Sequence, residues 1–519
     1  MTLKTKLFWS ALAGVASAAA GLAIAEAIAL VIAPASSPLI AVGSLVIDLA
    51  PTWAKDFAIA AFGTNDKIFL LTLIVVLLTA LAAGAGALQL FTAPWGLVTF
   101  GVIGGIATIA ATTREQSLAS WAIPSVVGML GAALMLYRIV TKLGVWTATA
   151  QTVAAKGDQR ASGVSRRDFF VYIASTAVGA AVIGIGARTV NATTIAAAAV
   201  RKAIKLPAPA LAAPAIPDGA ALDVPGITPL ITPNADFYRI DTALQVPSID
   251  ASDWSLRVTG MVEEPFEITF DELLALPLTE RNITLMCVSN EIGGDLTGNA
   301  TWLGYPLHKI LERAKPQSGA NMVLSRSIDG FTAGTPLDVL QETDRDCLLA
   351  VGMNGEPLPL EHGFPVRMVV PGLYGYVSAT KWVVELELTT YERSRAYWTD
   401  RGWSAKGPVK TCSRIDVPTA RQTLDSGTIV IAGIAWAQHT GIEAVEVRID
   451  GGEWMPARLA APISDDTWVQ WALDWDASSG AHVIEARATD KDGTVQSGQF
   501  APVAPNGAEG WDSVRLDVA

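Results

Sequence analysis

The sequence predicts a multi-domain chain: an N-terminal α-helical transmembrane region, a mixed α+β domain, and a C-terminal β-sandwich. Three observations predict this order. Long apolar stretches occupy the first 140 residues or so, strand and helix patterns alternate from about 230, and short alternating runs separated by Gly and Asp turns begin at about 425. With 519 residues, the chain has room for three or four domains of roughly 150 residues each.

Charge divides the chain in the same way. Residues 1–187 hold 11 Lys and Arg against 7 Asp and Glu, whereas 188–519 hold 26 against 42. The first part is almost entirely Ala, Leu, Ile, Val and Gly, and the second has an ordinary acidic composition. Because nucleic acids are polyanions, the acidic body excludes nucleic-acid binding as its main role.

Four apolar stretches are each close to the ~20 residues that a membrane-spanning helix needs. They lie at about 8–33, 68–89, 95–112 and 119–140. A secretory signal peptide would explain only the first of them. A shorter stretch, 38–50, contains Asp48 and precedes Pro51, and we interpret it as a re-entrant or interfacial segment. Glu26, within the first stretch, is either a polar contact between helices or a helix-end residue that reaches outward.

Basic residues predict the orientation in the cytoplasmic membrane, because Lys and Arg concentrate in cytoplasmic loops. Two of them, Lys4 and Lys6, precede the first span, and only three lie in the predicted outside loops. Six follow the fourth span: Arg138, Lys142, Lys156, Arg160, Arg166 and Arg167. We therefore expect a multi-pass protein with a cytoplasmic N-terminus.

Residues 165–170 read Ser-Arg-Arg-Asp-Phe-Phe and open a weakly apolar stretch that ends at 187. This pattern is typical of a twin-arginine export signal, although Arg166 and Arg167 could instead be simple cytoplasmic anchors. The weak apolarity and the position at the boundary of the soluble part favour the signal. We therefore expect the twin-arginine machinery as a partner, and a soluble part that folds before it crosses to the extracytoplasmic side.

Residues 188–229 contain six prolines among many alanines, a composition that excludes a regular helix and predicts a semi-stiff tether. The predicted domains are the transmembrane region of about four spans at 1–164, the export signal and fifth span at 165–187, the linker at 188–229, an α+β domain at 230–424 and a β domain at 425–519.

The three cysteines have different surroundings. Cys347 lies in a buried-strand pattern and Cys412 in a polar loop, so we expect a core residue and a free surface thiol respectively. Cys287 ends the run Ile-Thr-Leu-Met-Cys shortly before Gly293-Gly294. A strand that delivers a thiol to a loop presents one soft metal ligand, although a buried core cysteine is the common alternative. An odd count gives no disulfide framework.

Other polar residues join Cys287 further along the chain. Residues 266–276 predict a strand end followed by a helix, with Asp271 near the helix start, and 306–314 predict another short helix. The loop bearing His362 and Arg367 precedes a buried strand, and a Gly-rich segment then leads to Lys381. Together these side chains could bind a phosphate or another anion, while each alone is more often structural.

In combination, these motifs resemble the sulfite oxidase family of molybdenum-cofactor oxidoreductases. The resemblance covers about 230–519 and rests on the single-cysteine loop, Met-Asn-Gly-Glu-Pro-Leu-Pro (353–359), His-Gly-Phe-Pro-Val-Arg (362–367) and Lys-Trp (381–382). It implies a single molybdopterin with Cys287 as the molybdenum ligand. The residues that it places on the cofactor are Phe237, Tyr238, Arg239, Ile240, Asp241, Cys287, Ser327, His362, Arg367, Ala379, Thr380 and Lys381.

The resemblance supports the cofactor better than the substrate. Sulfite oxidases continue the cysteine loop with Ala-Gly-Asn-Arg-Arg, and the second arginine helps hold sulfite. This chain has Val-Ser-Asn-Glu-Ile at 288–292, so a cation is lost and a carboxylate gained, which disfavours a dianion. We therefore expect a two-electron oxygen-atom transfer on a small-molecule substrate other than sulfite. Arg239, Asn290, Tyr374 and Tyr376 are the candidate pocket residues beside Cys287.

The end of the chain predicts a β-sandwich of immunoglobulin-like type. Alternating runs recur at 428–436, 442–449, 467–475 and 481–488, with turns such as Asp450-Gly451-Gly452 between them. Relatives in the resembling family carry such a domain after the cofactor domain and often use it to dimerise.

The electrons must pass to another molecule. The chain has four histidines, none within its first 300 residues, and no cysteine spacing suited to c-type haem or iron–sulfur clusters. We expect neither haem nor an iron–sulfur cluster in this chain, and an external electron carrier or haem-containing partner. The alternatives are a non-catalytic, membrane-anchored protein that binds a ligand or partner on a degenerate sulfite oxidase fold, and a membrane segment that binds quinone.

Overall fold

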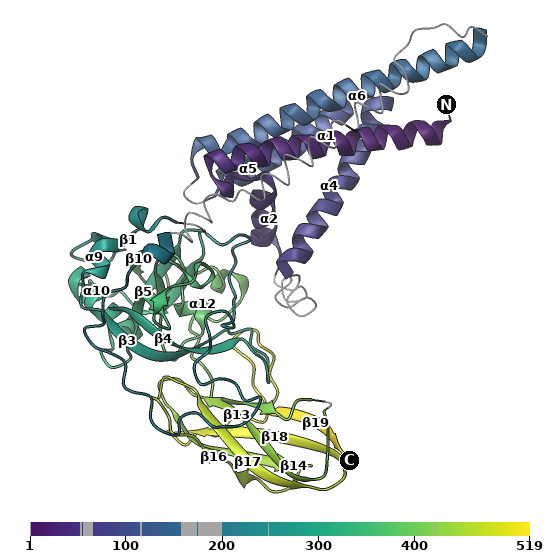
Figure 1. The fold of residues 1–519 in the computed structure, drawn as a ribbon. Coiled ribbons are helices and arrows are strands. Elements are labelled where there is room, and N and C mark those ends of the chain that lie inside the picture. The colour runs from purple at the N-terminus through teal and green to yellow at the C-terminus, as the bar shows by residue number, and fades with distance from the viewer. Residues whose placement is uncertain are drawn as a thin grey trace. The chain divides into compact units, whose positions relative to one another are not determined.

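The computed structural model describes residues 2–51, 54, 66–114, 117–156, 174, 200–247, 249–420 and 422–519. The chain forms two compact units (Figure 1). The helical unit comprises Met1–Ala196 with Thr242–Val246, and the second unit comprises Ala197–Asp241 with Pro247–Ala519.

Four helices among the described residues are long and apolar enough to cross a membrane. They are α1 (Leu3–Ile32), α4 (Asp66–Phe91), α5 (Trp95–Thr112) and α6 (Ala122–Lys156). They coincide with the four predicted apolar stretches. The predicted export signal and fifth span at 165–187 lie outside the described residues, apart from Ala174.

Small residues allow close helix contacts inside this unit, beside larger buried side chains such as Leu136 and Ile139. A Cβ on Gly14 would lie 1.9 Å from the Ala82 carbonyl oxygen, so α1 and α4 touch backbone to backbone. Larger apolar side chains such as Val76, Val102 and Ile109 are exposed instead. Small residues at the contacts and large apolar residues outside are what a lipid-facing helical bundle requires.

The short apolar stretch forms a helix, α2 (Pro38–Leu49). At ~1.5 Å per residue, its 12 residues fall short of the ~30 Å hydrocarbon core. The Ser37 hydroxyl, at its N-cap, donates a hydrogen bond of 2.7 Å to Glu26 Oε1. Glu26 is therefore a polar contact between segments, and the re-entrant or interfacial role of α2 stays a prediction.

One mixed sheet and one antiparallel sheet form the α+β part of the second unit (Figure 1). The first has the order β2-β1-β10-β5-β6, with β1 (Ser255–Gly260), β2 (Phe266–Thr269), β5 (Met322–Ser327), β6 (Thr332–Pro336) and β10 (Val383–Thr389). The second has the order β3-β4-β7-β8, with β9 pairing β7; its strands are β3 (Thr279–Met286), β4 (Thr297–Pro306), β7 (Leu348–Met353), β8 (Glu356–Pro357) and β9 (Arg367–Val369).

Short helices connect these strands: α9 (Phe270–Leu274), α10 (Leu307–Ala314), α11 (Leu337–Gln341) and α12 (Gly375–Ser378). The predicted strand-to-helix change at 266–276 is confirmed, as is the helix predicted at 306–314. Thr269 and Glu272 form a capping box that fixes the start of α9, because each side chain satisfies a backbone N–H of the other.

The C-terminal part consists of two β-sheets. The four-stranded sheet, in the order β11-β13-β17-β16, contains β11 (Cys412–Val417), β13 (Gly427–Trp436), β16 (Arg458–Leu459) and β17 (Val469–Ala477). The five-stranded sheet, in the order β12-β19-β18-β14-β15, contains β12 (Thr423–Leu424), β14 (Ile442–Ile449), β15 (Met455–Pro456), β18 (Gly480–Asp490) and β19 (Asp512–Val518).

Residues of both sheets share one core, in which Ile431 and Trp471 from one sheet pack with Val445, Ile484 and Val514 from the other. The four predicted runs correspond to β13, β14, β17 and β18. The sheet begins earlier than the predicted boundary at 425, because β11 pairs with β13. The immunoglobulin-like class of this β-sandwich stays a prediction.

The proline-rich segment is not a free tether over its described part. The Ala210 amide donates to the Leu278 carbonyl, and the Leu222 amide donates to Gln470 Oε1 at 2.7 Å. Arg201 forms an ion pair of 2.8 Å with Glu356. Residues 200–203 are helical, and the backbone between the prolines that follow still has donors that bind the body.

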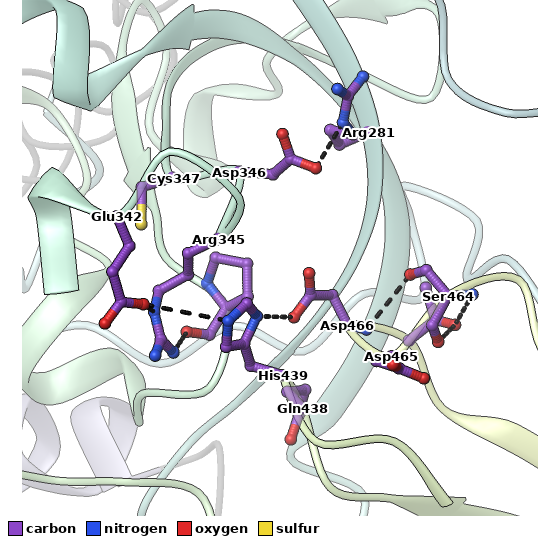
Figure 2. Close-up of polar contacts among 12 residues, drawn as sticks. Arg281, Glu342, Arg345, Asp346, Cys347, Gln438, His439, Ser464, Asp465 and Asp466 are labelled. Atoms are coloured by element: carbon purple, nitrogen blue, oxygen red, sulfur yellow. Dashed lines mark hydrogen bonds and ion pairs between the residues drawn. The ribbon is translucent and has the colours of Figure 1, made fainter.

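A polar cluster joins the α+β part to the β-sandwich (Figure 2). The His439 ring lies between two carboxylates: Nδ1 is 3.2 Å from Asp466 Oδ1, and Nε2 is 4.0 Å from Glu342 Oε2. Arg345 pairs with the same Glu342 and donates to the Pro371 carbonyl. The hydrogen bond to Asp466 raises the pKa of His439, and burial raises the pKa of Asp466.

Both shifts make stability depend on pH with the same sign. A raised pKa means that the folded state binds the proton more tightly, so the stabilisation is present below the ordinary His pKa of 6.5 and is lost as the pH rises through the raised value. For the full chain in detergent, we expect His439 to add to the free energy of unfolding at pH 6 relative to that at pH 8, while the lowered pKa of His362 changes the same difference in the opposite direction. His439→Gln should reduce that difference by roughly 0.5–1 kcal/mol.

Chemical denaturation followed by tryptophan fluorescence at the two pH values measures this difference. His308→Gln removes a histidine outside the cluster and should leave the difference unchanged. An unchanged difference in His439→Gln would contradict the assignment.

Candidate functional site

Cys287 directly follows β3, as the sequence predicts. Its amide donates to the Leu296 carbonyl at 2.9 Å, and its Sγ accepts a hydrogen bond from the Ser289 amide at 3.4 Å. The residue is 8% exposed. Burial raises the pKa of the thiol, while the bond from Ser289 and the charge of Lys381 oppose that rise. Strand β3 thus holds the Cys287 thiol at the start of a short loop. The charge of Lys381 favours the thiolate form of this side chain.

Asn290 closes the loop after Cys287. Its amide donates to the Cys287 carbonyl, and its side-chain Oδ1 accepts the Leu296 amide at 2.7 Å. Asn290 was predicted to line the substrate pocket. In the structure its Oδ1 is instead hydrogen-bonded within the loop. Glu291, the carboxylate that distinguishes the loop, is exposed.

Aromatic rings form one wall near this loop. Phe237 stacks on Tyr238 at 5.1 Å and meets Trp302 and His362 edge-on at 5.7 and 5.4 Å. Desolvation and then the Cys287 charge raise the pKa of the Tyr238 phenol. The predicted residue Tyr238 is thus electrostatically coupled to the predicted metal ligand, and Phe237 stacks on Tyr238.

Basic side chains gather next to this wall. Lys381 donates to Asp241 Oδ2 at 3.0 Å and to the Glu361 carbonyl at 2.9 Å. Arg239 also pairs with Asp241 Oδ2 at 3.0 Å. Arg367 is 3% exposed, stacks over the Trp302 ring at 5.0 Å and donates to the His362 carbonyl. The structure therefore brings together the anion-binding residues that the resemblance implies.

The cluster holds more positive charge than its carboxylate balances. Within the described residues, Arg367 has no ion-pair partner, and Lys381 and Arg239 share Asp241. Burial lowers the pKa of Arg367 to about 10 and that of Lys381 to about 8. A buried cation without a counter-ion is costly, so this arrangement favours an anionic ligand such as a phosphate.

His362 contributes a buried ring nitrogen without a hydrogen-bond partner in the described structure. Burial and the nearby cations Lys381 and Arg367 lower its pKa to about 3, so the ring is neutral at pH 7. Its Nε2 is 3.1 Å from the Asn234 carbonyl oxygen and must carry the proton. In the described structure, Nδ1 is buried without a hydrogen-bond partner. It is an acceptor for an N–H donor, which a pterin ring has, so the residues present fit a phosphate-bearing pterin.

Other predicted residues lie around this cluster in supporting positions. Ser327, at the end of β5, is opposite Val383, and its Oγ accepts from the Asp329 amide. The Thr380 hydroxyl is 2.7 Å from the Ser325 hydroxyl, and this bond fixes the backbone of the loop 379–381. Lys381 is the charged residue of that loop. Ile240 is exposed.

The two tyrosines differ. Tyr376 donates its hydroxyl to the Ser404 carbonyl at 2.8 Å and packs near Trp403, so its polar atom is engaged by another loop. Tyr374 is buried, and burial followed by charges that include Cys287 raises its pKa. The contribution of Cys287 to this rise ranks behind those of burial and Cys412, whereas for Tyr238 it ranks directly after burial.

Sequence reasoning missed several members of the site. Trp302 lies under Arg367, and the backbone carbonyls of Asn234 and Glu361 bind His362 and Lys381. Trp302 could have been noticed as a single tryptophan within a strand pattern. Contacts made by backbone carbonyls leave no signal in the sequence. The core position of Cys347 is confirmed, but a surface position for Cys412 is wrong: it opens β11 and is buried against Gln496.

Comparison with known proteins agrees with this geometry. Residues 243–398 match the oxidoreductase molybdopterin binding domain family. The chain is 36% identical over 159 residues to the uncharacterized oxidoreductase YuiH of Bacillus subtilis, which covers 30% of this chain and 76% of that protein. The chain belongs to the sulfite oxidase family of molybdopterin oxidoreductases.

Other relatives match this chain over only part of their length. It is 28% identical over 321 residues to mitochondrial sulfite oxidase of Homo sapiens, across 53% of this chain and 58% of the human protein. The chain thus spans little more than half of that relative. The sulfane dehydrogenase SoxCD of Paracoccus pantotrophus is 26% identical, with a TM-score of 0.46 over 52% of this chain and 75% of that chain.

The buried cations predict how the site responds to a lost charge. Lys381→Gln removes one charge-assisted partner, worth about 1.5–3 kcal/mol, so we expect roughly tenfold to hundredfold weaker pterin retention. Molybdenum and oxidised-pterin content after extended dialysis measures this. Lys406→Gln, beside Tyr391, is the matched control. Equal retention in both variants would remove Lys381 from the phosphate contact.

Proposed function

We propose that this chain is a membrane-anchored molybdenum-cofactor oxidoreductase that performs two-electron oxygen-atom transfer on a small molecule outside the cytoplasmic membrane. One observation carries the proposal: the buried Cys287 thiol, held directly after β3, is electrostatically coupled to Lys381, and Lys381 and Arg367 are themselves buried. A structural cysteine does not need such cations, whereas a metal-bound thiolate beside a phosphate does.

The chain's own residues would divide the work. Cys287 would ligate molybdenum, and Arg239, Arg367 and Lys381 would hold the phosphate of a single molybdopterin. The neutral His362 would accept a pterin N–H, while the Phe237 and Tyr238 rings exclude water. The bound cofactor would supply the oxygen-atom transfer chemistry.

The loop after Cys287 supports a substrate other than sulfite. Residues 288–296 contain Glu291 and Asp295 and no Lys or Arg. Coulomb repulsion makes this loop unsuited to a dianion. An uncharged oxygen donor or acceptor, such as a sulfoxide-type group, is the substrate class that fits the loop.

The helical region supports the location. Its four apolar helices suit a multi-pass anchor, and the distribution of Lys and Arg favours a cytoplasmic N-terminus. With the twin-arginine signal at 165–187, the folded cofactor domain would reach the extracytoplasmic side. Reducing equivalents would be exchanged with an external electron carrier or a haem-containing partner.

Metal and pterin content of the purified full chain, beside Cys287→Ser, tests the proposal. We expect near-stoichiometric molybdenum in the unmodified protein. Cys287→Ser should keep the pterin, because the phosphate contacts remain, and lose more activity than the ~10–100-fold typical of changes behind a metal ligand. Cys412→Ser, a buried thiol in β11, is the control.

The opposite outcome is also informative. No molybdenum, despite cofactor supply and intact export, would overturn the redox function. It would leave a membrane-anchored protein that binds a ligand or partner on a degenerate sulfite oxidase fold.

A further inference from the structure

The strand that carries Cys287 lies at the edge of its sheet. β3 pairs with β4 on one side, where Thr284 is opposite Asn299. An edge strand presents unpaired backbone groups that another segment can bind. Here the C-terminal part binds them: the Thr284 amide donates to the Asp466 carbonyl at 2.9 Å, and Gln438 Nε2 donates to the Thr284 carbonyl at 3.4 Å.

The Thr284 side chain extends this contact. Its Oγ1 accepts the Trp468 amide at 2.9 Å and donates to Asn299 Oδ1 at 3.1 Å. Thr284 is 1% exposed. The backbone N–H, the backbone C=O and the hydroxyl thus each bind the C-terminal part, three residues before the thiol.

The same part also contacts the chain on both sides of Cys287. Trp436 Nε1, at the end of β13, is 3.1 Å from Met286 Sδ. On the other side, Arg414 Nη1 donates to the Gly294 carbonyl at 2.9 Å. The β-sandwich therefore holds the chain before and after the thiol.

The segment that receives Thr284 is itself fixed (Figure 2). The His439 amide donates to the Asp465 carbonyl at 2.9 Å, while the His439 ring binds the Asp466 side chain. The Asp466 amide donates to Ser464 Oγ at 3.2 Å. The Asp466 carbonyl that binds Thr284 therefore belongs to a turn whose backbone and side chains are both held.

We propose that the C-terminal β-sandwich positions the Cys287 ligand through Thr284, so that a contact between two parts of the chain sets the metal–sulfur geometry. This inference rests on the proposed function. Metal sites need their ligands within about 0.5 Å and 10–20° of the productive geometry, which supporting hydrogen bonds provide. Thr284 is a positioning residue that acts on the metal through Cys287.

Thr284→Val tests the hydroxyl, because valine has the same shape and cannot accept the Trp468 amide. In the full-length holoenzyme we expect unchanged molybdenum content. The Mo(V) paramagnetic resonance g-values and the sulfur-to-molybdenum absorption band should shift, and Thr284→Ser should restore both. Thr389→Val, a buried threonine on β10 bonded to Ser394, should match the unmodified protein.

The outcomes separate this inference from the proposed function. A Thr284→Val protein with full metal and an unshifted spectrum would overturn the positioning role alone. An unmodified chain without molybdenum would overturn the proposed function. In that metal-free protein, alkylation of Cys287 by iodoacetamide, followed by peptide mass spectrometry, should still be several-fold faster in Thr284→Val than in Thr284→Ser. Equal rates would overturn positioning there.

A second variant covers a folding failure. If Thr284→Val does not fold, Trp436→Phe keeps a ring in the β13 position and removes the Nε1 contact with Met286. It should shift the same spectral features. An unshifted spectrum in this fully loaded variant would overturn the inference.

Discussion

The site depends on one electrostatic constraint: basic side chains are buried together with too little negative charge to balance them. Asp241 is shared by Lys381 and Arg239, and Arg367 finds backbone carbonyls and the Trp302 ring. Burying such charges is energetically costly, because a charge removed from water needs a partner of opposite charge. An anionic cofactor would supply that partner, and the aromatic rings beside the cations would keep water from replacing it.

The position of the Cys287 thiol depends on contacts from two sources: its own loop and the distant C-terminal β-sandwich. Hydrogen bonds within the loop, from Ser289 and Asn290, fix the backbone on the C-terminal side of Cys287. Contacts from residues about 150 to 180 positions later fix the strand before it, since Trp436 and Trp468 reach Met286 and Thr284. The β-sandwich is thus part of the site's construction, even though none of its residues belongs to the cofactor motifs.

The sequence allowed prediction of features that follow from local patterns. Apolar length predicted the four long helices, alternation predicted β13, β14, β17 and β18, and a β-branched run predicted the strand before Cys287. The hydrogen-bond partners were beyond such patterns. Asn290 and Tyr376 were predicted as pocket residues, but Asn290 Oδ1 accepts the Leu296 amide and the Tyr376 hydroxyl donates to the Ser404 carbonyl. Cys412 resembled a loop residue because the partner strand of β11 lies elsewhere in the chain.

The covered edge of β3 also has a consequence for biosynthesis. The Trp468 amide that binds Thr284 comes 184 residues later in the chain. At about 5–20 residues per second, the ribosome releases it roughly 10–40 s after the strand itself. During that interval the nascent strand has an open edge that could pair with another chain. The strand that precedes the cysteine therefore completes its contacts only after Trp468 has been translated.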